Sequence, residues 1–429
     1  MRKRRKSSIL PLLLACLVPV GLFTFVVFSQ VVYPFKLDDI TSYQVLPTYH
    51  WDLLAYLAHD YQMWESRLLL TTLAVTLTHA IWLWRLLAIA AFSATAIVPV
   101  FYFKIKNRPL AILLTTLLVA LIPLEYHFNT GAITTTSNYL FPFAAGLIAW
   151  LPIIRSLQGL AVPRTFYFLA FPFLILANNS EQIMVVSFLL LGLALGSNII
   201  RRSRIGLLTR LIWLTETIGS FLFWHFSPGI AIRIKQEIWK QFPGFEQLSF
   251  FKKLQMGQSI TSQYLFTKSL WLPALLLLAL ALASLYRRRF LTLIPLVLPA
   301  YLMIRPSQFT IFQANSTTVH DARVAADNQL LNTSYTAIFL AATALIVLAF
   351  ILLKTYIPIF ILGVGYATSL MLGFSPTIVP SQGRTQLYLL YACAYAILYL
   401  TMICTTDKIK LIKNGGNNHG SSSLFERKK

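Results

Sequence analysis

Two adjacent carboxylates follow the first long apolar run of the sequence, where Lys36 and Leu37 lead into Asp38 and Asp39. Neighbouring carboxylates beside a membrane face can act as a general base or hold a divalent ion. Acidic residues are also common at helix starts, where their charge suits the helix dipole. Asp38 and Asp39 are therefore candidate catalytic or metal-binding residues, while a solvated pair at a helix start stays open as an alternative.

Three arginines follow short polar motifs that could bind phosphate. Arg67 ends the motif Trp-Glu-Ser-Arg, Arg233 follows Ser-Pro-Gly, and Arg384 ends Ser-Gln-Gly-Arg. A guanidinium binds phosphate through paired, charge-assisted hydrogen bonds. An arginine near the end of a membrane span is also commonly an interfacial anchor. The motifs alone are compatible with both roles.

A polar run without charge, Asn-Thr-Gly-Ala-Ile-Thr-Thr-Thr-Ser-Asn-Tyr-Leu-Phe-Pro, covers residues 129–142 between two apolar segments. Lipid cannot satisfy its backbone, so protein or water must do so. The run suits a cavity lining that binds sugar hydroxyls, and it suits a plain loop equally well. A second polar turn, Asn-Asn-Ser-Glu, ends where an acid at the interface could have a tuned pKa. The candidate pocket residues are Asn129, Thr130, Asn138, Tyr139 and Glu181.

The elements that must position these residues are apolar. The chain is 57% hydrophobic and 12% charged, whereas a soluble chain carries about 25% charged residues. Apolar runs long enough to cross a hydrocarbon core recur throughout. We expect an all-α, polytopic transmembrane helical bundle of roughly twelve spans, with 64–79 as an amphipathic or re-entrant helix. The predicted spans are 9–33, 80–103, 109–126, 139–154, 163–177, 181–199, 207–226, 269–286, 290–305, 333–353, 355–374 and 386–405.

The basic residues predict the orientation. The net charge is +22, and Lys and Arg gather in short loops that alternate with longer, acid-bearing loops. Cytoplasmic loops collect Lys and Arg, so both termini are predicted to be cytoplasmic and the active face extracytoplasmic. The same charges can contact anionic lipid headgroups, and no extramembrane fold is present to hold a nucleic-acid site. We expect one transmembrane domain, 1–405, with large outer loops 34–79, 227–268 and 306–332, and a disordered basic cytoplasmic tail, 406–429.

Two further features concern the membrane part. Glu216 lies inside a predicted span, where a charge usually faces a cavity or a partner. It is either a functional group or a partner of Arg85 or of a polar neighbour. The segment from Ile230 to Lys253 alternates aromatic and basic residues and predicts an interfacial helix, broken at Pro243 and Gly244. The sequence contains no P-loop, no Gly-x-Ser-x-Gly and no His-Glu-x-x-His motif.

The arrangement of these features resembles the GT-C superfamily, polytopic glycosyltransferases that use polyprenyl-phosphate sugars. The elements Trp-x-x-Arg, Thr-Gly…Asn-Tyr-x-x-Pro, Asn-Asn-x-Glu-Gln, Ser-Pro-Gly and Gly-Arg are similar to those of an uncharacterised bacterial family related to the phage-type glucosyltransferases that decorate surface polysaccharide. The likeness covers most of residues 30–400. Ser66 stands where that family usually has a glycine before the arginine, so the role carried over to Arg67 is in question.

The resemblance implies transfer of a sugar from a polyprenyl-phosphate carrier to a surface glycan acceptor outside the cytoplasmic membrane. Asp38 or Asp39 would act as base on the acceptor hydroxyl, or would hold a divalent metal ion if the reaction uses one. The three arginines would neutralise the leaving lipid phosphate, where charge grows in the transition state. Asn129, Thr130, Asn138, Tyr139 and Glu181 would line the sugar pocket.

Two other functions stay open at the level of sequence. A transporter or flippase for a lipid-linked sugar would place charged or broken helices at the bilayer midplane. Polar residues here gather instead at the predicted outer edge, with Glu216 and Arg85 as the exceptions. A polysaccharide polymerase or ligase would use the same outer arginines, so the sequence does not separate it from a glycosyltransferase.

Overall fold

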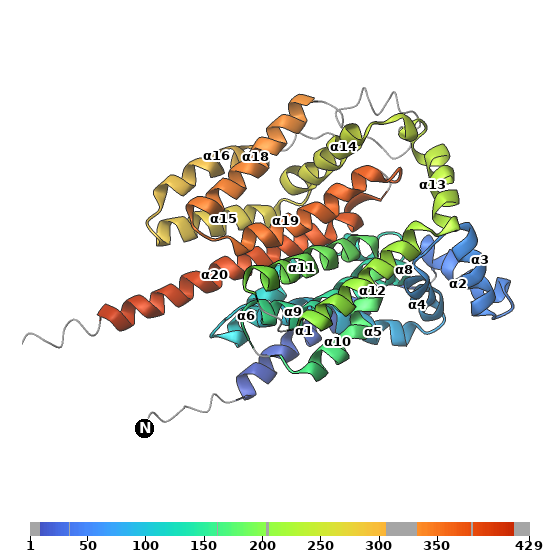
Figure 1. The fold of residues 1–429 in the computed structure, drawn as a ribbon, viewed down its shortest axis with the longest axis horizontal. Helices are drawn as coiled ribbons and strands as arrows, with labels where there is room; N and C mark the ends of the chain where they lie inside the picture. Colours follow the sequence, from blue (N-terminus) through green and yellow to red (C-terminus); the bar gives the residue numbers. More distant parts are fainter. Residues whose placement is uncertain are drawn as a thin grey trace, which may run out of the picture.

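The structure is a computed structural model that describes residues 9–33, 35–160, 162–202, 206–305, 333–378 and 381–415. Within these ranges the chain forms helices and no strand, which confirms the predicted all-α class for this part of the chain. Figure 1 shows the long helices running side by side through the body of the molecule. The predicted outer loop 306–332 and residues 416–429 of the predicted tail lie outside the described residues.

The first half of the chain alternates long helices with short ones. Its elements are α1 (Leu10–Phe28), α2 (Asp38–Thr48), α3 (Leu53–Met63), α4 (Leu68–Thr78), α5 (Ile81–Ile97), η1 (Val98–Phe101), α6 (Arg108–Ala120), α7 (Glu125–Phe128), α8 (Ala132–Thr135), η2 (Thr136–Leu140), α9 (Phe141–Leu157), α10 (Arg164–Asn178), α11 (Glu181–Ile200) and α12 (Leu207–His225). α2, α3 and α4 together form the first predicted outer loop, so that loop is helical.

The second half contains a bent helix pair and the longest helix. Its elements are α13 (Pro228–Gln241), η3 (Phe245–Gln247), α14 (Phe250–Gln263), η4 (Tyr264–Lys268), α15 (Trp271–Tyr286), η5 (Phe290–Leu296), α16 (Val297–Ile304), α18 (Thr333–Leu352), α19 (Ile357–Leu370), η8 (Met371–Phe374), η9 (Gln382–Gln386) and α20 (Leu387–Gly415). The break predicted at Pro243 and Gly244 lies between α13 and α14, and Gly244 has a left-handed φ of +86° there.

Several helices are long and apolar enough to cross a membrane, so the chain has the character of a multi-pass membrane protein. Seven helices in the described part meet this condition, and an eighth is added if Phe250–Lys268 and Trp271–Tyr286, bent by 79°, count as one span. The seven are Leu10–Phe28, Ile81–Phe101, Ala132–Leu157, Glu181–Ile200, Ser334–Leu352, Ile357–Phe374 and Gly383–Met402.

The predicted count of roughly twelve spans is not confirmed, because several predicted spans form shorter helices. α6 has 13 residues and α10 has 15, which at about 1.5 Å per residue gives roughly 20 Å of helix against about 30 Å of hydrocarbon. α12 is long enough at 19 residues but carries Arg210 and Glu216. The stretch predicted as a non-spanning helix forms α4, whose 11 residues are too few to cross.

α20 forms the centre of the bundle. Every residue from Leu387 to Leu398 is buried, which fits a helix that is apolar on all sides. The helix runs through the middle of the ribbon in Figure 1 and packs against α19, α15 and α6. It continues to Gly415, beyond the predicted end of the membrane domain at residue 405.

Loops predicted to share one side of the membrane gather at one end of the bundle. At the basic end, Lys104 donates to the carbonyl of Gln158 at 3.3 Å and Arg289 to that of Leu352 at 2.7 Å. The start of α1 and the end of α20 lie toward this end, whereas α2, α3, α4 and α13 lie at the other (Figure 1). The predicted inner and outer loops therefore separate in space, as alternate crossings require.

Close packing of α19 on α20 depends on a glycine. A Cβ added at Gly365 would lie 2.6 Å from the Cβ of Ala392 and 3.1 Å from the Cα of Leu389. Small residues of this kind let membrane helices approach closely. At Gly363, two residues earlier on α19, an added Cβ meets nothing within 4 Å.

We expect Gly365→Leu to destabilise the protein by about 1–3 kcal/mol or more, because α19 must move away from α20. Gly363→Leu, the matched control, is expected to leave stability nearly unchanged. Thermal unfolding of both variants in detergent measures the difference. Equal melting temperatures for the two variants would contradict the packing described here.

Candidate functional site

The buried carboxylate of Asp39 connects the start of α2 to the polar run 129–142. Asp39 lies in the first turn of α2 and is 2% exposed. Its oxygens accept hydrogen bonds from the backbone N–H of Ile133 at 3.2 Å and from the N–H and hydroxyl of Thr134, both at 2.8 Å. The N–H of Asp38 donates to the carbonyl of Thr130 at 2.8 Å. The acidic pair and the polar run 129–142 therefore form one unit.

This contact leaves no room for a side chain on the loop. Gly131 has a φ of +133°, and an added Cβ would lie 2.6 Å from Oδ1 of Asp39. Burial raises the pKa of Asp39, and the hydrogen bonds from Thr134 and Ile133 partly offset this increase. With both oxygens occupied, Asp39 positions the loop rather than facing a substrate.

Asp38 is the more accessible member of the pair. Its side chain is 50% exposed and forms an ion pair with Arg384 at 3.3 Å. Arg384 also donates to the hydroxyl of Thr130 and lies 5.9 Å from the ring centre of Tyr139. Four predicted site residues from three distant parts of the sequence thus meet in what we term the Asp38 cluster: Asp38, Thr130, Tyr139 and Arg384.

Tyr139 and Asn138 lie on η2, a π-helical turn between α8 and α9. π-helical turns insert an extra residue into a helix and are frequent at functional sites. This turn brings the Tyr139 ring under the guanidinium of Arg384. Asn138 is half-buried, whereas Asn129 at the start of the same polar run is exposed.

A second charged group, the Glu65 cluster, contains Glu65, Arg67, Glu181 and Arg233. Arg67 binds Glu65 through two hydrogen bonds of 3.0 Å and lies 3.6 Å from Glu181. Arg233 on α13 pairs with the same Glu65 carboxylate and lies 5.5 Å from the ring centre of Trp64. The cluster contains two carboxylates and two guanidinium groups, so the charges of Arg67 and Arg233 are already neutralised within the protein.

The paired charges shift each other's pKa. Burial alone would raise the pKa of Glu65, but Arg67 and Arg233 outweigh it and hold the pKa below its ordinary value. Burial likewise disfavours the charged form of Arg67, and the carboxylates of Glu181 and Glu65 more than reverse this, which raises its pKa. Both groups therefore stay charged across the physiological pH range.

The two clusters adjoin at Tyr139 and Tyr388. The Tyr388 hydroxyl donates to the carbonyl of Tyr139 at 3.1 Å. The Tyr139 phenol is close enough to Arg67 to contribute to the rise in its pKa. Gln182, which follows Glu181, donates to the carbonyls of Thr368 and Thr385 at 2.9 and 3.3 Å. These bonds hold the start of α11 against α19 and η9.

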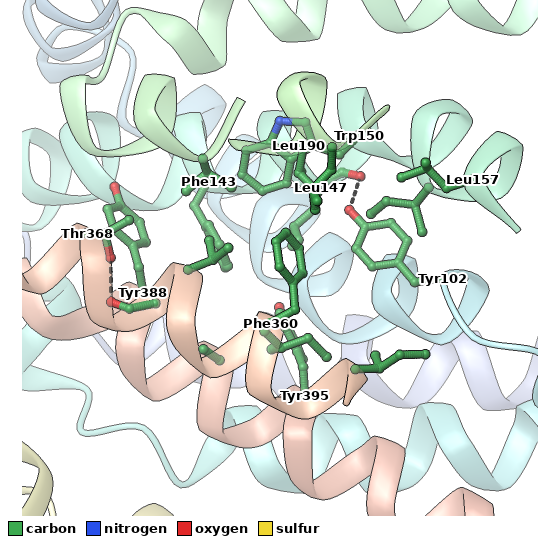
Figure 2. Close-up of a pocket in the computed structure, with 18 of the residues that line it drawn as sticks. Tyr102, Phe143, Leu147, Trp150, Leu157, Leu190, Phe360, Thr368, Tyr388 and Tyr395 are labelled. Carbon is green, nitrogen blue, oxygen red and sulfur yellow. Dashed lines mark hydrogen bonds between the residues drawn. The ribbon is translucent and has the colours of Figure 1, made fainter. Parts of the chain in front are cut away.

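An apolar groove leads away from this junction. It has a volume of about 300 Å³ and lies between α9, α11, α19 and α20. Figure 2 shows Tyr388 and Thr368 at one end and Tyr102 and Leu157 at the other, with Phe143, Leu147 and Leu190 between them. Its lining is almost entirely aliphatic and aromatic, so its occupant must be apolar over most of its length.

Few acidic side chains near the site could bind a divalent metal ion. The described residues contain no group of three or more His, Cys, Asp or Glu side chains able to hold an ion. Both oxygens of Asp39 already accept hydrogen bonds, which leaves Asp38 as the one accessible carboxylate of the predicted pair. The residues present are a poor fit for a divalent ion.

Sequence reasoning missed Glu65, the acid on which both Arg67 and Arg233 converge. The signal was present, since Glu65 lies two residues before Arg67 in Trp-Glu-Ser-Arg. Glu216 was predicted to be either a functional group or a partner of Arg85 or of a polar neighbour; it accepts a hydrogen bond from the Asn178 amide at 2.6 Å, while Arg85 lies over the ring of Phe28.

No protein-family model matches this chain, and the comparisons with curated proteins and with solved structures found no match either.

Asp60 gives the Glu65 cluster a dependence on pH. It is buried on α3, and burial together with the nearby Glu65 carboxylate raises its pKa from 3.8 to about 7, against the opposing effect of Arg233 and Arg67. Between these two pH values the folded state keeps a proton on Asp60 that the unfolded chain releases. This contribution to stability declines as the pH rises from the unfolded value of 3.8 toward the folded value of about 7.

We expect Asp60→Asn to remove this decline. Between about pH 5 and about pH 7 the parent protein should lose on the order of 2 kcal/mol more stability than the variant. Melting temperatures of both proteins across that range give the comparison. Parallel curves for parent and variant would show that Asp60 titrates near its ordinary value.

Proposed function

We propose that the protein is a membrane glycosyltransferase that moves a sugar from a polyprenyl-phosphate carrier to a glycan acceptor outside the cytoplasmic membrane. The observation that supports it most directly is the apolar groove, which ends at Tyr388 where two charged clusters adjoin. An isoprenoid chain fits the groove by its chemistry, and a phosphate at its head would reach the arginines. This arrangement is consistent with the resemblance to GT-C enzymes.

Asp38 is the base in this proposal. Its exposed carboxylate takes the proton of the acceptor hydroxyl, and the hydroxyl oxygen forms a bond to the anomeric carbon of the sugar. The bond between that carbon and the phosphate oxygen breaks, and the electron pair leaves with the polyprenyl phosphate. Asp39 is a positioning residue, because its oxygens are committed to the backbone of Ile133 and Thr134.

Arg384 is the best placed of the three arginines to meet the phosphate. Its partner Asp38 is half exposed, whereas Arg67 and Arg233 are held by the buried Glu65. Charge that develops on the leaving phosphate is stabilised most by a donor already in place. Arg67 can contribute by releasing Glu181, from which it is 3.6 Å away.

The catalytic assignment is tested by surface-glycan analysis in cells that lack the gene and carry a variant copy. We expect Asp38→Asn to lower sugar addition by about 100-fold or more, the usual contribution of a general base. Asp52→Asn is the matched control, since Asp52 belongs to the same outer segment and caps α3 through the N–H of Ala55.

Mass spectrometry of the released glycans distinguishes the outcomes, with membrane levels of each variant measured in parallel. Normal sugar addition by Asp38→Asn at normal protein level would reject the assignment. Accumulation of an unmodified lipid-linked sugar on one leaflet in the gene deletion would indicate a transporter instead.

The proposed orientation predicts which end of the bundle faces out. Lys36 and Lys106 are both exposed and lie toward opposite ends, beside Asp38 and beside the basic turn before α6. A membrane-impermeant thiol reagent added to intact cells should label Lys36→Cys and leave Lys106→Cys unlabelled until the cells are broken. The reverse pattern would place Asp38 in the cytoplasm and remove the proposed acceptor side.

A further inference from the structure

A second cavity, of about 230 Å³, opens beside the Glu65 cluster on the other side of α11 from the groove. Its walls are the end of α10, the start of α11, Ser66 before α4, and one face of α12 from Gly219 to Trp224. Glu181 and Met184 face this cavity, whereas Ile183 and Val186 face the groove. The start of α11 therefore separates an apolar space from a polar one.

Hydrogen bonds to residues of α12 fix two of the polar side chains that line this cavity. The Asn178 amide donates to Oε2 of Glu216 at 2.6 Å and to the hydroxyl of Thr217 at 3.0 Å. The Ser220 hydroxyl donates to Oε1 of Glu216 at 2.9 Å. Both protons of Asn178 and the proton of Ser220 are thus used, so these side chains can only accept from a ligand.

One acceptor in this wall has no partner. Asn178 is 3% exposed, and its Oδ1 has no hydrogen-bond partner among the described residues. A buried amide oxygen left unpaired costs about 1–3 kcal/mol. Asn178 lines the cavity, but its Oδ1 has almost no accessible surface, so a ligand donor would pair with it after a small shift of the amide.

Asn179 supplies the opposite polarity. Its Oδ1 accepts from the N–H groups of Leu69 and Leu70, both at 3.1 Å, at the start of α4. The carbonyl oxygen is thereby fixed, and the amide protons are left to donate. The Glu181 carboxylate adds a further acceptor on the α11 side. The cavity wall therefore contains both donors and acceptors, and the hydroxyl groups of a sugar ring need both.

The charge and the aromatic wall restrict the ligand further. Glu181 lines the cavity and Glu216 lies directly behind it, and among the described residues no Lys or Arg side chain lines it, which disfavours an anion. Phe223 and Trp224 supply the apolar ring faces that bind the C–H face of a sugar. Polar groups in small number beside aromatic side chains are typical of a small-molecule site.

We propose that this cavity binds the neutral sugar ring of the substrate, with Asn178, Asn179, Glu181 and Ser220 as hydroxyl partners and Trp224 as the stacking wall. The inference rests on the proposed function, since it places the transferred sugar. A donor with its chain in the groove and its phosphate at Arg384, on the side toward Arg67, would bend around the start of α11, because Glu181 borders the cavity and lies 3.6 Å from Arg67. Of the residues predicted from sequence for the sugar pocket, Glu181 is the one that lines it.

Gly219 gives a direct test, because a Cβ added there meets nothing within 4 Å and would project into open space. Gly219→Leu should fill the cavity without removing a polar group. Gly192→Leu on α11 is the matched control, since an added Cβ there also meets nothing within 4 Å and Gly192 lines neither cavity nor groove.

The probes are the methyl glycosides of glucose, galactose, mannose and N-acetylglucosamine, observed by saturation-transfer NMR on the purified full chain in detergent. At least one glycoside should receive saturation from the parent protein, from Gly192→Leu and from Asp38→Asn. The signal should fall at least fivefold in Gly219→Leu and in Trp224→Leu. Trp224→Leu enlarges the cavity, so it provides a second variant if Gly219→Leu does not fold.

The outcomes separate this inference from the proposed function. Absence of signal with every glycoside, or an unchanged signal in a folded Gly219→Leu or Trp224→Leu protein, would overturn the sugar site. If Asp38→Asn loses sugar transfer while the glycoside signal is unchanged in the cavity variants, the proposed glycosyltransferase function is retained and the sugar-binding role of the cavity is rejected. Binding that depends on the cavity, with normal transfer by Asp38→Asn, would retain the sugar site and reject Asp38 as base.

Discussion

The site depends on one buried carboxylate that accepts hydrogen bonds from a loop. Asp39 receives three donors from Ile133 and Thr134, and its oxygen fills the space where Gly131 lacks a side chain. A buried charge is tolerated only when its hydrogen-bonding capacity is met, so α2 and the loop must move together. This interaction holds Asp38 in front of Arg384, and through the same loop it presents Tyr139 to both charged clusters.

The three candidate arginines are each paired with a carboxylate at one end of the bundle. Glu65 and Glu181 neutralise Arg67 and Arg233, and Asp38 faces Arg384. Breaking a buried pair leaves an uncompensated charge, so these arginines hold position until another anion replaces a carboxylate. Arg384 exchanges most readily, because its partner is half exposed. Guanidinium groups that are paired at rest would suit the proposed ligand, a lipid that carries a phosphate.

The amino-acid sequence predicted where the helices lie and which loops gather at the same end of the bundle. It did not predict the lengths of the helices or the contacts between distant side chains. Apolar runs located the helices, and the basic loops predicted which turns gather at one end. The number of spans was not predictable, because α6 and α10 are apolar but short, and hydropathy does not record where a helix ends. Asp38, Thr130, Tyr139 and Arg384 were identified as candidates separately, but only the fold brings them together. The division of roles between Asp38 and Asp39 could not be read from adjacent carboxylates, since it depends on which one is buried against Gly131.

The central claim is that one lipid phosphate lies along the groove with its head at the charged end. Polyprenyl phosphates that carry a photoreactive group either beside the phosphate or at the far end of the chain test it directly in membranes. The account predicts that the first probe crosslinks near Tyr388 and Arg384, and that the second crosslinks toward Leu157 and Leu193, at the opposite end of the groove. Crosslinks confined to α10 and α12, outside the groove, would contradict it.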